Sequence, residues 1–232
     1  MTVRDQGAVT LGPPGPPSSV LYDAALSGAP GQLLLRGAGW STPLPVDRWV
    51  GAADDDDMLA LGRLHRALPG GGQILDLACG TGRHGEHLQS LGRQVLGVDT
   101  SRVAVARAGG RGVHALCTDA LGPLPYGHHA WDGVLLLDGS VGLGGDPLLL
   151  LCRVRDLLSA YGWLLLELDP AGGNDRGPAD LHDGRTASAP FRWARLDDGD
   201  GLRRAARIAD LAVLDRWVSG VRRFALLGPG HA

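Results

Sequence analysis

The stretch "ILDLACGTGRHGEH", residues 74–87, decides the fold of this chain. It begins with the apolar residues expected of a buried strand, turns sharply at a group of glycines, and continues as a helix. Gly80, Gly82 and Gly85 fit the Gly-x-Gly-x-x-Gly pattern, in which small residues let a nucleotide approach the backbone at a helix N-terminus. The chain contains 37 glycines, so this pattern alone cannot identify the ligand.

The segments that follow this stretch alternate between short apolar runs and amphipathic runs. This alternation predicts an α/β fold, a Rossmann-like doubly wound sheet of about seven strands with helices on both faces. Near the C-terminus, "LAVLDRWV" and "RRFALLG" predict an antiparallel pair that completes the sheet, so that the last strand is antiparallel. We expect strands at 73–78, 94–98, 113–117, 131–137 and 162–169, and helices at 82–91, 101–108, 146–159 and 199–210.

Three parts of the chain differ in composition. Residues 1–19 contain "GPPGPPSS" and predict a flexible tail, because proline lacks an amide hydrogen and glycine resists ordering. Residues 20–70 predict an N-terminal lid or cap, with helices at 19–28 and 54–68 and a strand at 31–37. Residues 71–228 predict the Rossmann-like domain, with a flexible loop at 170–190.

Composition restricts the function. The chain has 232 residues, 44% of them hydrophobic, and a formal net charge of −3, which argues against a nucleic-acid surface. No lysine is present, so a catalytic lysine is excluded. We expect a cytoplasmic protein with reduced thiols and no membrane association, because the first residues lack an apolar leader and the run "LLLLC" is too short to span a bilayer.

Acidic residues at the strand ends separate two adenosine cofactors. Asp76 lies inside its strand, where a dinucleotide site normally has apolar residues, and it suits the ammonium group of S-adenosylmethionine. Asp99 ends the next strand and would accept hydrogen bonds from ribose hydroxyls with either cofactor. Asp119 would accept from an adenine amino group and the amide of Ala120 would donate to the ring, although an Asx-turn is an alternative role for Asp119.

Five motifs in order, "ILDLACGTGR", "GVDTS", "CTDA", "WDGVLLLDG" and "LLSAYGWLLLEL", resemble those of class I S-adenosylmethionine-dependent methyltransferases. The resemblance covers residues 73 to about 169, with Ala78 where the family often has glycine. "LPVDRWVGAADD", "DGSVGLGGDP" and "PFRWARL" extend it to bacterial methyltransferase-domain proteins of unassigned substrate. The resemblance implies S-adenosylmethionine as cofactor, bound by Asp76, Ala78, Gly80, Gly82, Asp99, Thr100, Asp119, Ala120 and Leu137.

The acceptor side has weaker candidates. The resemblance places Leu137 and Asp138 nearest the transferred methyl group, and Asp138 is the first candidate for a general base, followed by His128 and His129. His182 lies in the expected 170–190 loop and is a further candidate. His84 and His87 share a helix face, but no carboxylate or cysteine follows at ligand spacing, so we expect no metal.

Aromatic residues outside the motif block favour an acceptor pocket in the lid. Core packing is the alternative for each of them, and Arg48 either reaches a carboxylate or is solvated. The pocket candidates are Tyr22, Trp40, Trp49, Phe191 and Trp193.

The expected function is therefore methylation of a small organic molecule, in a bacterial natural-product pathway. One alternative is a protein with the same fold that does not transfer methyl groups, such as a cyclase, a hydrolase or a binding subunit. An NAD-dependent oxidoreductase is less favoured, because the Tyr-x-x-x-Lys pair of short-chain dehydrogenases cannot exist without lysine. The sequence leaves open the oligomeric state and whether oxygen, nitrogen, carbon or sulfur is methylated.

Overall fold

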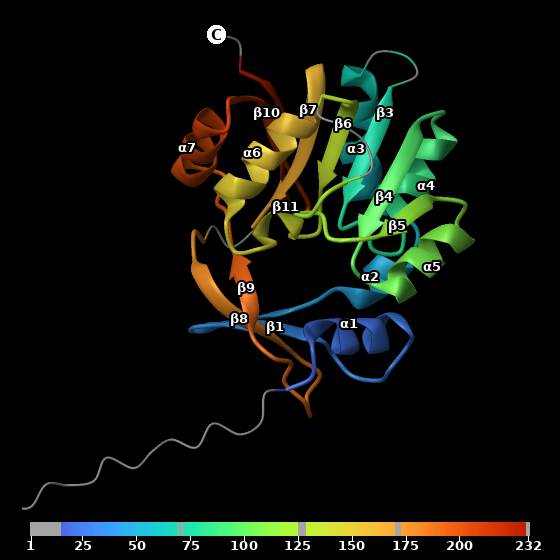
Figure 1. Ribbon diagram of the computed structural model, residues 1–232, viewed down its shortest axis with the longest axis vertical. Helices are drawn as coiled ribbons and strands as arrows, with labels where there is room; N and C mark the ends of the chain where they lie inside the picture. Colours follow the sequence, from blue (N-terminus) through green and yellow to red (C-terminus); the bar gives the residue numbers. More distant parts are fainter. Residues whose placement is uncertain (1–14, 69, 71, 125–128, 170–172, 231–232) are drawn as a thin grey trace, which may run out of the picture.

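A computed structural model describes residues 15–68, 70, 72–124, 129–169 and 173–230 (Figure 1). Most of the expected N-terminal tail, residues 1–14, lies outside the described residues. Helix α1, Ser18–Leu26, begins just inside the segment expected to be tail.

A seven-stranded sheet forms the larger part of the molecule, with strand order β10-β11-β7-β6-β3-β4-β5. Five neighbouring strands are parallel, and β11 is antiparallel to both β7 and β10. The predicted sheet with an antiparallel last strand is confirmed. The strands are β3 Gln73–Leu77, β4 Gln94–Asp99, β5 His114–Cys117, β6 Trp131–Leu136, β7 Leu158–Leu168, β10 Leu211–Ser219 and β11 Arg222–Pro229.

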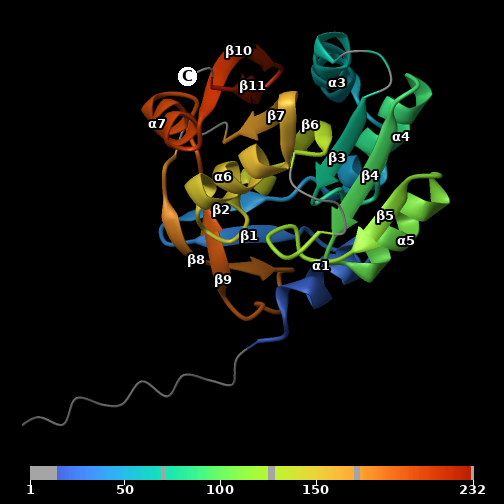
Figure 2. The same ribbon diagram turned by 45° about the horizontal axis from the view of Figure 1, so that its top comes forward.

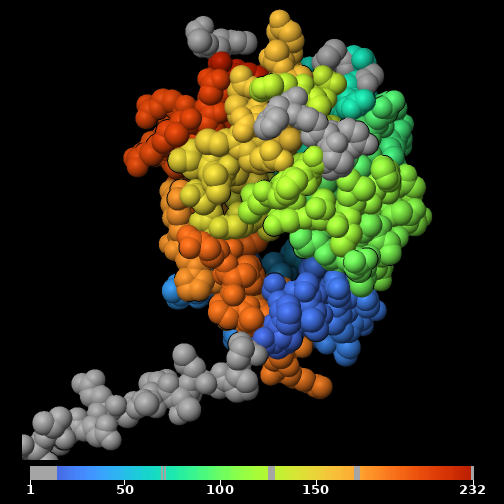
Figure 3. Space-filling model, viewed as in Figure 1, coloured from blue at the N-terminus to red at the C-terminus, as the bar shows by residue number. Residues whose placement is uncertain are grey.

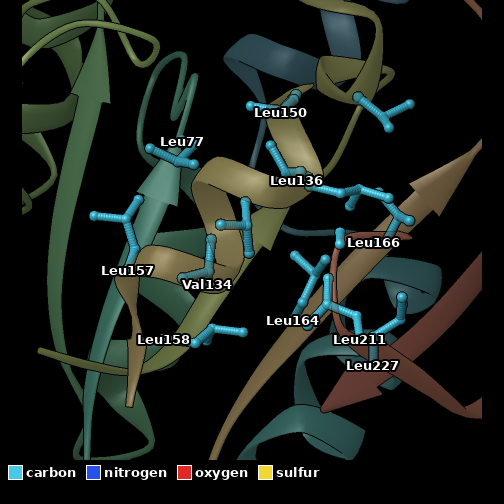
Figure 4. Packing of buried hydrophobic residues seen from close by; sticks show 14 of the residues in the cluster. Leu77, Val134, Leu136, Leu150, Leu157, Leu158, Leu164, Leu166, Leu211 and Leu227 are labelled. Carbon is cyan, nitrogen blue, oxygen red and sulfur yellow. The ribbon is translucent and has the colours of Figure 1, made fainter. Parts of the chain in front are cut away.

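Helices cover both faces of this sheet because alternate strand residues point to opposite sides. Leu75 and Leu77 pack in the cluster that contains α6 and α7, whereas Ile74 packs with α3 and α4. Figure 4 shows the leucine-rich packing around β6, β7 and α6. The helices are α3 Asp55–Ala67, α4 Arg83–Ser90, α5 Arg102–Gly110, α6 Pro147–Leu157 and α7 Asp200–Ile208. Among the described helices, none is long and apolar enough to cross a membrane.

A second, four-stranded sheet lies across the carboxyl ends of the parallel strands (Figures 1 and 2). Its order is β2-β1-β8-β9, all antiparallel. The strands are β1 Leu34–Gly37, β2 Trp40–Pro43, β8 Arg176–His182 and β9 Phe191–Ala194. We call this sheet, with α1 and α2 (Val46–Val50), the cap.

The cap corrects one expectation. The segment 170–190, expected to be a flexible loop, contains β8, in which Leu181 pairs with Leu35 of β1. Gly177 and Pro178 hide the strand in the sequence, because both residues are depleted in strands. The cap therefore includes chain from outside the expected 20–70 segment.

Polar contacts hold the cap to the larger sheet. The hydroxyl of Thr81 donates to the carbonyl of Trp49, and the guanidinium of Arg111 donates to the carbonyls of Val50 and Gly51, at 2.7 Å each. These bonds join the end of α2 to the turn before α4 and to the residue after α5. The cap is thus fixed above the glycine turn that follows β3.

Candidate functional site

A cavity of about 490 Å³ lies between the larger sheet and the cap. Figure 3 shows the molecule hollowed between these two parts. The floor comes from the carboxyl ends of β3, β4, β5 and β6, and the roof from α1, β1, β8, β9 and the segment around α2. Open α/β sheets bind their ligands at this edge, where the strand order reverses, here between β3 and β6.

Asp76 is the most unusual group of the floor. It lies near the end of β3 and is 2% exposed, and its Oδ2 atom has no hydrogen-bond partner among the described residues. Burial raises the pKa of this carboxyl to about 7. A buried carboxylate without a partner is costly, so its place on the cavity wall suits a cationic or hydrogen-donating ligand group.

Asp99, the last residue of β4, organises the glycine turn. One carboxylate oxygen accepts from the amide of Gly80 at 2.9 Å, and the other accepts from the amide of Ser101 at 2.8 Å. Burial raises its pKa. An ionised carboxylate has about four acceptor positions, so room remains on Asp99 for a ligand hydroxyl.

The glycines of the turn have different roles. Gly80 lines the cavity with φ +54°, and a Cβ there would lie 3.5 Å from the hydroxyl of Tyr22. Gly82 was expected to admit the cofactor but does not line the cavity. A Cβ at Gly82 would lie 2.8 Å from the Cβ of Ala108, so this glycine allows α4 to approach α5.

The other expected cofactor residues lie on the cavity wall, namely Ala78, Thr100, Asp119, Ala120 and Leu137. Asp119 also forms the Asx-turn weighed as its alternative role, because its Oδ1 accepts from the amide of Leu121 at 2.9 Å. Ala78 has φ +59°, a left-handed conformation that explains why glycine is common at this position in the family.

Asp138 lies at the floor, one residue after Leu137, and is held by arginines. Arg48 and Arg83 each donate to one of its carboxylate oxygens at 2.6 Å, and Arg222 lies at 3.5 Å. Burial would raise the pKa of Asp138, but His84 and these arginines outweigh it and lower the pKa to about 2. A carboxylate so engaged is a poor general base, so the structure argues against the role expected for Asp138.

The ion pairs around Asp138 continue into the interior. Arg222 donates to both oxygens of Glu167 at 2.7 and 2.8 Å and to Asp57 at 2.6 Å, and Arg83 also contacts Asp57. We call these residues the arginine–carboxylate cluster. Its three arginines and three carboxylates balance in charge, and its members are Arg48, Asp57, Arg83, Asp138, Glu167 and Arg222.

Two of the histidines expected near the reaction, His129 and His182, do not line the cavity. His129 is exposed just before β6 begins, where its amide donates to Asp156 at 2.8 Å, at the amino edge of the sheet opposite the cavity. His128 lies outside the described residues. His182 belongs to β8 and accepts from the amide of Gly184.

His84 is the histidine that lines the cavity. It is buried, with Nε2 3.3 Å from Asp57, and burial lowers its pKa to about 4. Among the described residues, no group of three or more histidine, cysteine or acidic side chains is arranged to hold a metal ion.

Aromatic side chains form much of the roof. Tyr22 and Trp49 make an edge contact with ring centroids 6.0 Å apart, and Phe191 and Trp193 make another at 6.1 Å. All four line the cavity. Trp40 does not; the guanidinium of Arg195 lies 5.2 Å from the centroid of its ring.

Several cavity residues escaped the sequence analysis. Ser140 follows Asp138 by two residues in the 3₁₀ turn Ser140–Gly142, and its place after a predicted strand end was a usable signal. Arg192 lines the roof beside Trp193. Leu35 and Leu181 also line the roof, and no local pattern marks such residues, because they reach the cavity only through pairing of β1 with β8.

The residues present fit S-adenosylmethionine. The unpartnered carboxylate of Asp76 suits the ammonium group, and the room that remains on Asp99 suits a ribose hydroxyl. Near the carboxyl ends of the strands, three acidic residues of the cavity wall, Asp76, Asp99 and Asp119, form no ion pair with an arginine among the described residues. Such an acidic wall disfavours a pyrophosphate, which a dinucleotide would bring.

Comparison with known proteins agrees with this geometry. Residues 74–162 match the family model described as a methyltransferase domain. No curated protein matches the chain. The matched segment contains β3 to the start of β7, and therefore every strand end that forms the cavity floor.

Solved structures share the fold at low sequence identity. A SAM-dependent methyltransferase from Bacteroides fragilis, in complex with S-adenosylhomocysteine, is 19% identical, covers 93% of this chain and 95% of its own, and gives a TM-score of 0.73. The 1,6-didemethyltoxoflavin-N1-methyltransferase of Burkholderia thailandensis is 18% identical, with coverage of 76% and 79% and a TM-score of 0.56. An amino pentose methyltransferase from Micromonospora echinaspora is 19% identical, with coverage of 77% and 92% and a TM-score of 0.55.

The matched domain and the shared fold confirm the class that the motifs indicated. Residues 74–162 match a methyltransferase domain within a class I fold, and the expected cofactor and enzyme class agree with this match.

Proposed function

We propose that this S-adenosylmethionine-dependent methyltransferase acts on a small organic molecule. The single observation that carries the proposal is one cavity with two unlike walls, an acidic floor and an aromatic roof. The floor would hold the cofactor and the roof would hold the acceptor. Its volume of about 490 Å³ has to serve both, so the acceptor is small.

On the floor, Asp76 would hold the methionyl ammonium and Asp99 the ribose hydroxyls. Asp119 and the amide of Ala120 would bind the adenine. When bound, the cofactor supplies a methyl group on a sulfonium. A nucleophile attacks the methyl carbon in line, and the thioether leaves. The chain contributes positioning and exclusion of water, because the cap covers the floor at the strand ends.

On the roof, Tyr22, Trp49, Phe191 and Trp193 favour an acceptor with an apolar or planar body. Two of the similar structures are named for small organic substrates, a toxoflavin precursor and an amino pentose. These names support a place in a biosynthetic pathway for small molecules. The net charge of −3 supports it further against nucleic acids.

Calorimetric titration with S-adenosylhomocysteine tests the floor, with NAD as the parallel ligand. We expect micromolar binding of the first, no heat from the second, and loss of binding in Asp76→Asn. Binding of NAD alone would overturn the assignment of the glycine turn.

Isotopically labelled S-adenosylmethionine offered with small-molecule libraries and with total RNA then tests the acceptor class. Label in RNA and in no small molecule would refute the proposal.

A further inference from the structure

We propose that the acceptor atom is a weakly basic nitrogen on a planar molecule, oriented by the hydroxyl of Ser140 and methylated without a base from the enzyme. This inference rests on the proposed function and specifies its acceptor. It starts from a buried hydroxyl that lacks a partner. Its second basis is that no titratable side chain described on the cavity wall is suited to act as a base.

Ser140 is 5% exposed, and its Oγ atom has no hydrogen-bond partner among the described residues. Its backbone is fixed, because its amide donates to the carbonyl of Leu137 at 3.1 Å and its carbonyl accepts from the amide of Leu143 at 3.1 Å. The residue lines the cavity. A buried hydroxyl without a partner is unfavourable, so this atom is placed to meet a polar atom of a ligand.

The position of Ser140 favours the acceptor over the cofactor as that ligand. It follows Leu137 and Asp138 in the turn after β6, and Trp193 of the roof covers the same turn. A Cβ at Gly139 would lie 3.8 Å from Cζ2 of Trp193, and a Cβ at Gly142 would lie 2.5 Å from its Cε2. Ser140 therefore lies where the floor meets the aromatic roof.

Two indoles give the acceptor space its shape. Trp193 closes it beside Ser140, and Trp49 lines it with a buried Nε1 that also lacks a partner among the described residues. A flat ring with a polar atom at its edge fits both the space between the two indoles and the polar groups that line it. Its faces would pack on the aromatic side chains and its edge would meet the Ser140 hydroxyl.

Among the described residues, no acidic side chain of the cavity wall is suited to act as a base. Asp138 is occupied by Arg48 and Arg83. Asp76 and Asp99 are assigned to the cofactor, and the ammonium would keep Asp76 ionised and engaged. Asp119 is exposed and accepts from the amide of Leu121.

The other titratable groups of the wall are no better suited. His84 is buried with its Nε2 3.3 Å from Asp57, and burial lowers its pKa to about 4, so it is a weak base. Burial raises the pKa of the Tyr22 phenol and of the Cys79 thiol, so neither is ionised near neutral pH. Arg83 and Arg192 are cations. A reaction here has to proceed with a nucleophile that needs no deprotonation beforehand.

A weakly basic amine meets this requirement because it is neutral and carries a lone pair at neutral pH. An alcohol or a carbon acid would have to lose a proton first. The nitrogen lone pair forms the new N–C bond as the S–C bond breaks, and the electron pair of the broken bond stays on sulfur as a neutral thioether. The methylated nitrogen, now positively charged, releases its N–H proton to water. Before transfer, Ser140 accepts a hydrogen bond from that N–H and so directs the lone pair.

The test uses matched planar probes, a set of aminoquinolines and aminopyrimidines with the corresponding hydroxyl compounds, with labelled S-adenosylmethionine. We expect transfer to amines and none above background to their hydroxyl partners. For an amine substrate, kcat/KM should rise with pH and level off at the pKa of the amine itself, and the break should move when an amine of different pKa is used. Transfer to hydroxyl partners, to no amine, or with a break that is the same for all amines would overturn the proposal.

Variants test the positioning role. Ser140→Ala should lower kcat/KM for the amine about tenfold, mainly through KM, and weaken calorimetric binding of the N-methyl product in the presence of S-adenosylhomocysteine. Ser140→Thr should recover part of both, and the exposed Ser90→Ala serves as the control. Equal product binding in Ser140→Ala and the parent protein would refute the role of the hydroxyl.

Two further measurements separate the remaining explanations. His128→Ala and His129→Ala should leave the dependence of kcat/KM on pH unchanged. If either variant loses the rise of kcat/KM with pH, an enzyme base is revealed and the inference is refuted. Titration with S-adenosylhomocysteine alone separates the two levels of the proposal. If it binds and only oxygen, carbon or sulfur compounds are methylated, this inference fails and the proposed function stands. If it does not bind, the proposed function fails.

Discussion

Asp76, near the end of β3, and Asp138, two residues after β6, reach the same cavity from neighbouring strands, yet their surroundings are opposite. Asp138 is surrounded by three arginines and has a lowered pKa, whereas Asp76 keeps an oxygen without a partner and has a raised pKa. One carboxylate is already neutralised by the protein. The other is left for a ligand, and the difference lies in residues far away in the sequence.

The largest effect should come from breaking the cluster that neutralises Asp138. Arg222→Met removes the arginine partner of the buried Glu167 and one of the two arginine partners of Asp57, so we expect the free energy of unfolding to fall by about 3–5 kcal/mol. Urea denaturation measures this change. The control is Arg223→Met, which loses a half-exposed pair with Asp198 and should cost about 1 kcal/mol or less. Equal losses in the two variants would mean that the cluster contributes no more than a surface ion pair.

Neutralising each aspartate should change stability in opposite directions. Asp76→Asn removes a buried charge without a partner, so the free energy of unfolding of the free protein should rise at pH 8, whereas in Asp138→Asn it should fall. At the same time Asp76→Asn should weaken S-adenosylhomocysteine binding by about 1.5–3 kcal/mol, the usual value for a hydrogen bond to a charged group. Calorimetry and urea denaturation measure the two quantities. A fall in stability for both variants would contradict the contrast.

The pH dependence of cofactor binding sharpens the same contrast. The pKa of Asp76 is raised to about 7 in the free protein, and the ammonium of the ligand requires the ionised carboxylate. Affinity for S-adenosylhomocysteine should therefore fall about tenfold between pH 8 and pH 6, because a proton has to leave before binding. Asp138 stays ionised throughout and contributes no change in this range. Asp76→Asn is the control, because its affinity should not change between pH 6 and pH 8. If the affinity of the parent protein is equally independent of pH, the raised pKa of Asp76 is contradicted.

The sign for stability follows from the same shift. A carboxyl whose pKa is higher in the folded than in the unfolded state binds its proton more tightly in the folded state, so a rise in pH favours unfolding. Asp76 thus makes the free energy of unfolding of the free protein fall as pH rises from about 4 to 7. The ligand should reverse this trend near neutral pH, because it pairs with the ionised form.

Much of the larger sheet could be predicted because its evidence is local. Strands β3, β4 and β6 are mostly apolar runs with an acidic residue at or near the carboxyl end, so both the fold and the positions of Asp76 and Asp99 follow from short stretches. The cap could not be predicted in this way. Pro178 and the glycine beside it disguise β8, whose pairing with β1 joins segments more than 140 residues apart.

The roles of side chains were harder to predict than their positions. Asp138 lies at the strand end where the motif predicted it, but its chemistry depends on Arg48 and Arg222, from the cap and from the last strand. His129 was expected near the reaction because it precedes a motif strand. That position lies at the amino edge, and parallel strands place their ligand sites at the carboxyl edge.

The smallest effect concerns the backbone after the same two strands. Ala78 and Asp138 both have left-handed backbones, with φ values of +59° and +54°. Ala78→Gly should relieve strain at no loss of contacts, so the free energy of unfolding should rise by up to about 1 kcal/mol, less the entropy cost that glycine adds. Asp138→Gly relieves the same strain but loses the ion pairs with Arg48 and Arg83, so the free energy of unfolding of this variant should fall. Ala60→Gly, in the middle of α3, should lower stability by about 1 kcal/mol and serves as the control for a helical site without such strain. If Ala78→Gly loses as much stability as Ala60→Gly, the left-handed backbone at residue 78 carries no strain, and the two strand ends differ only in the partners of their carboxylates.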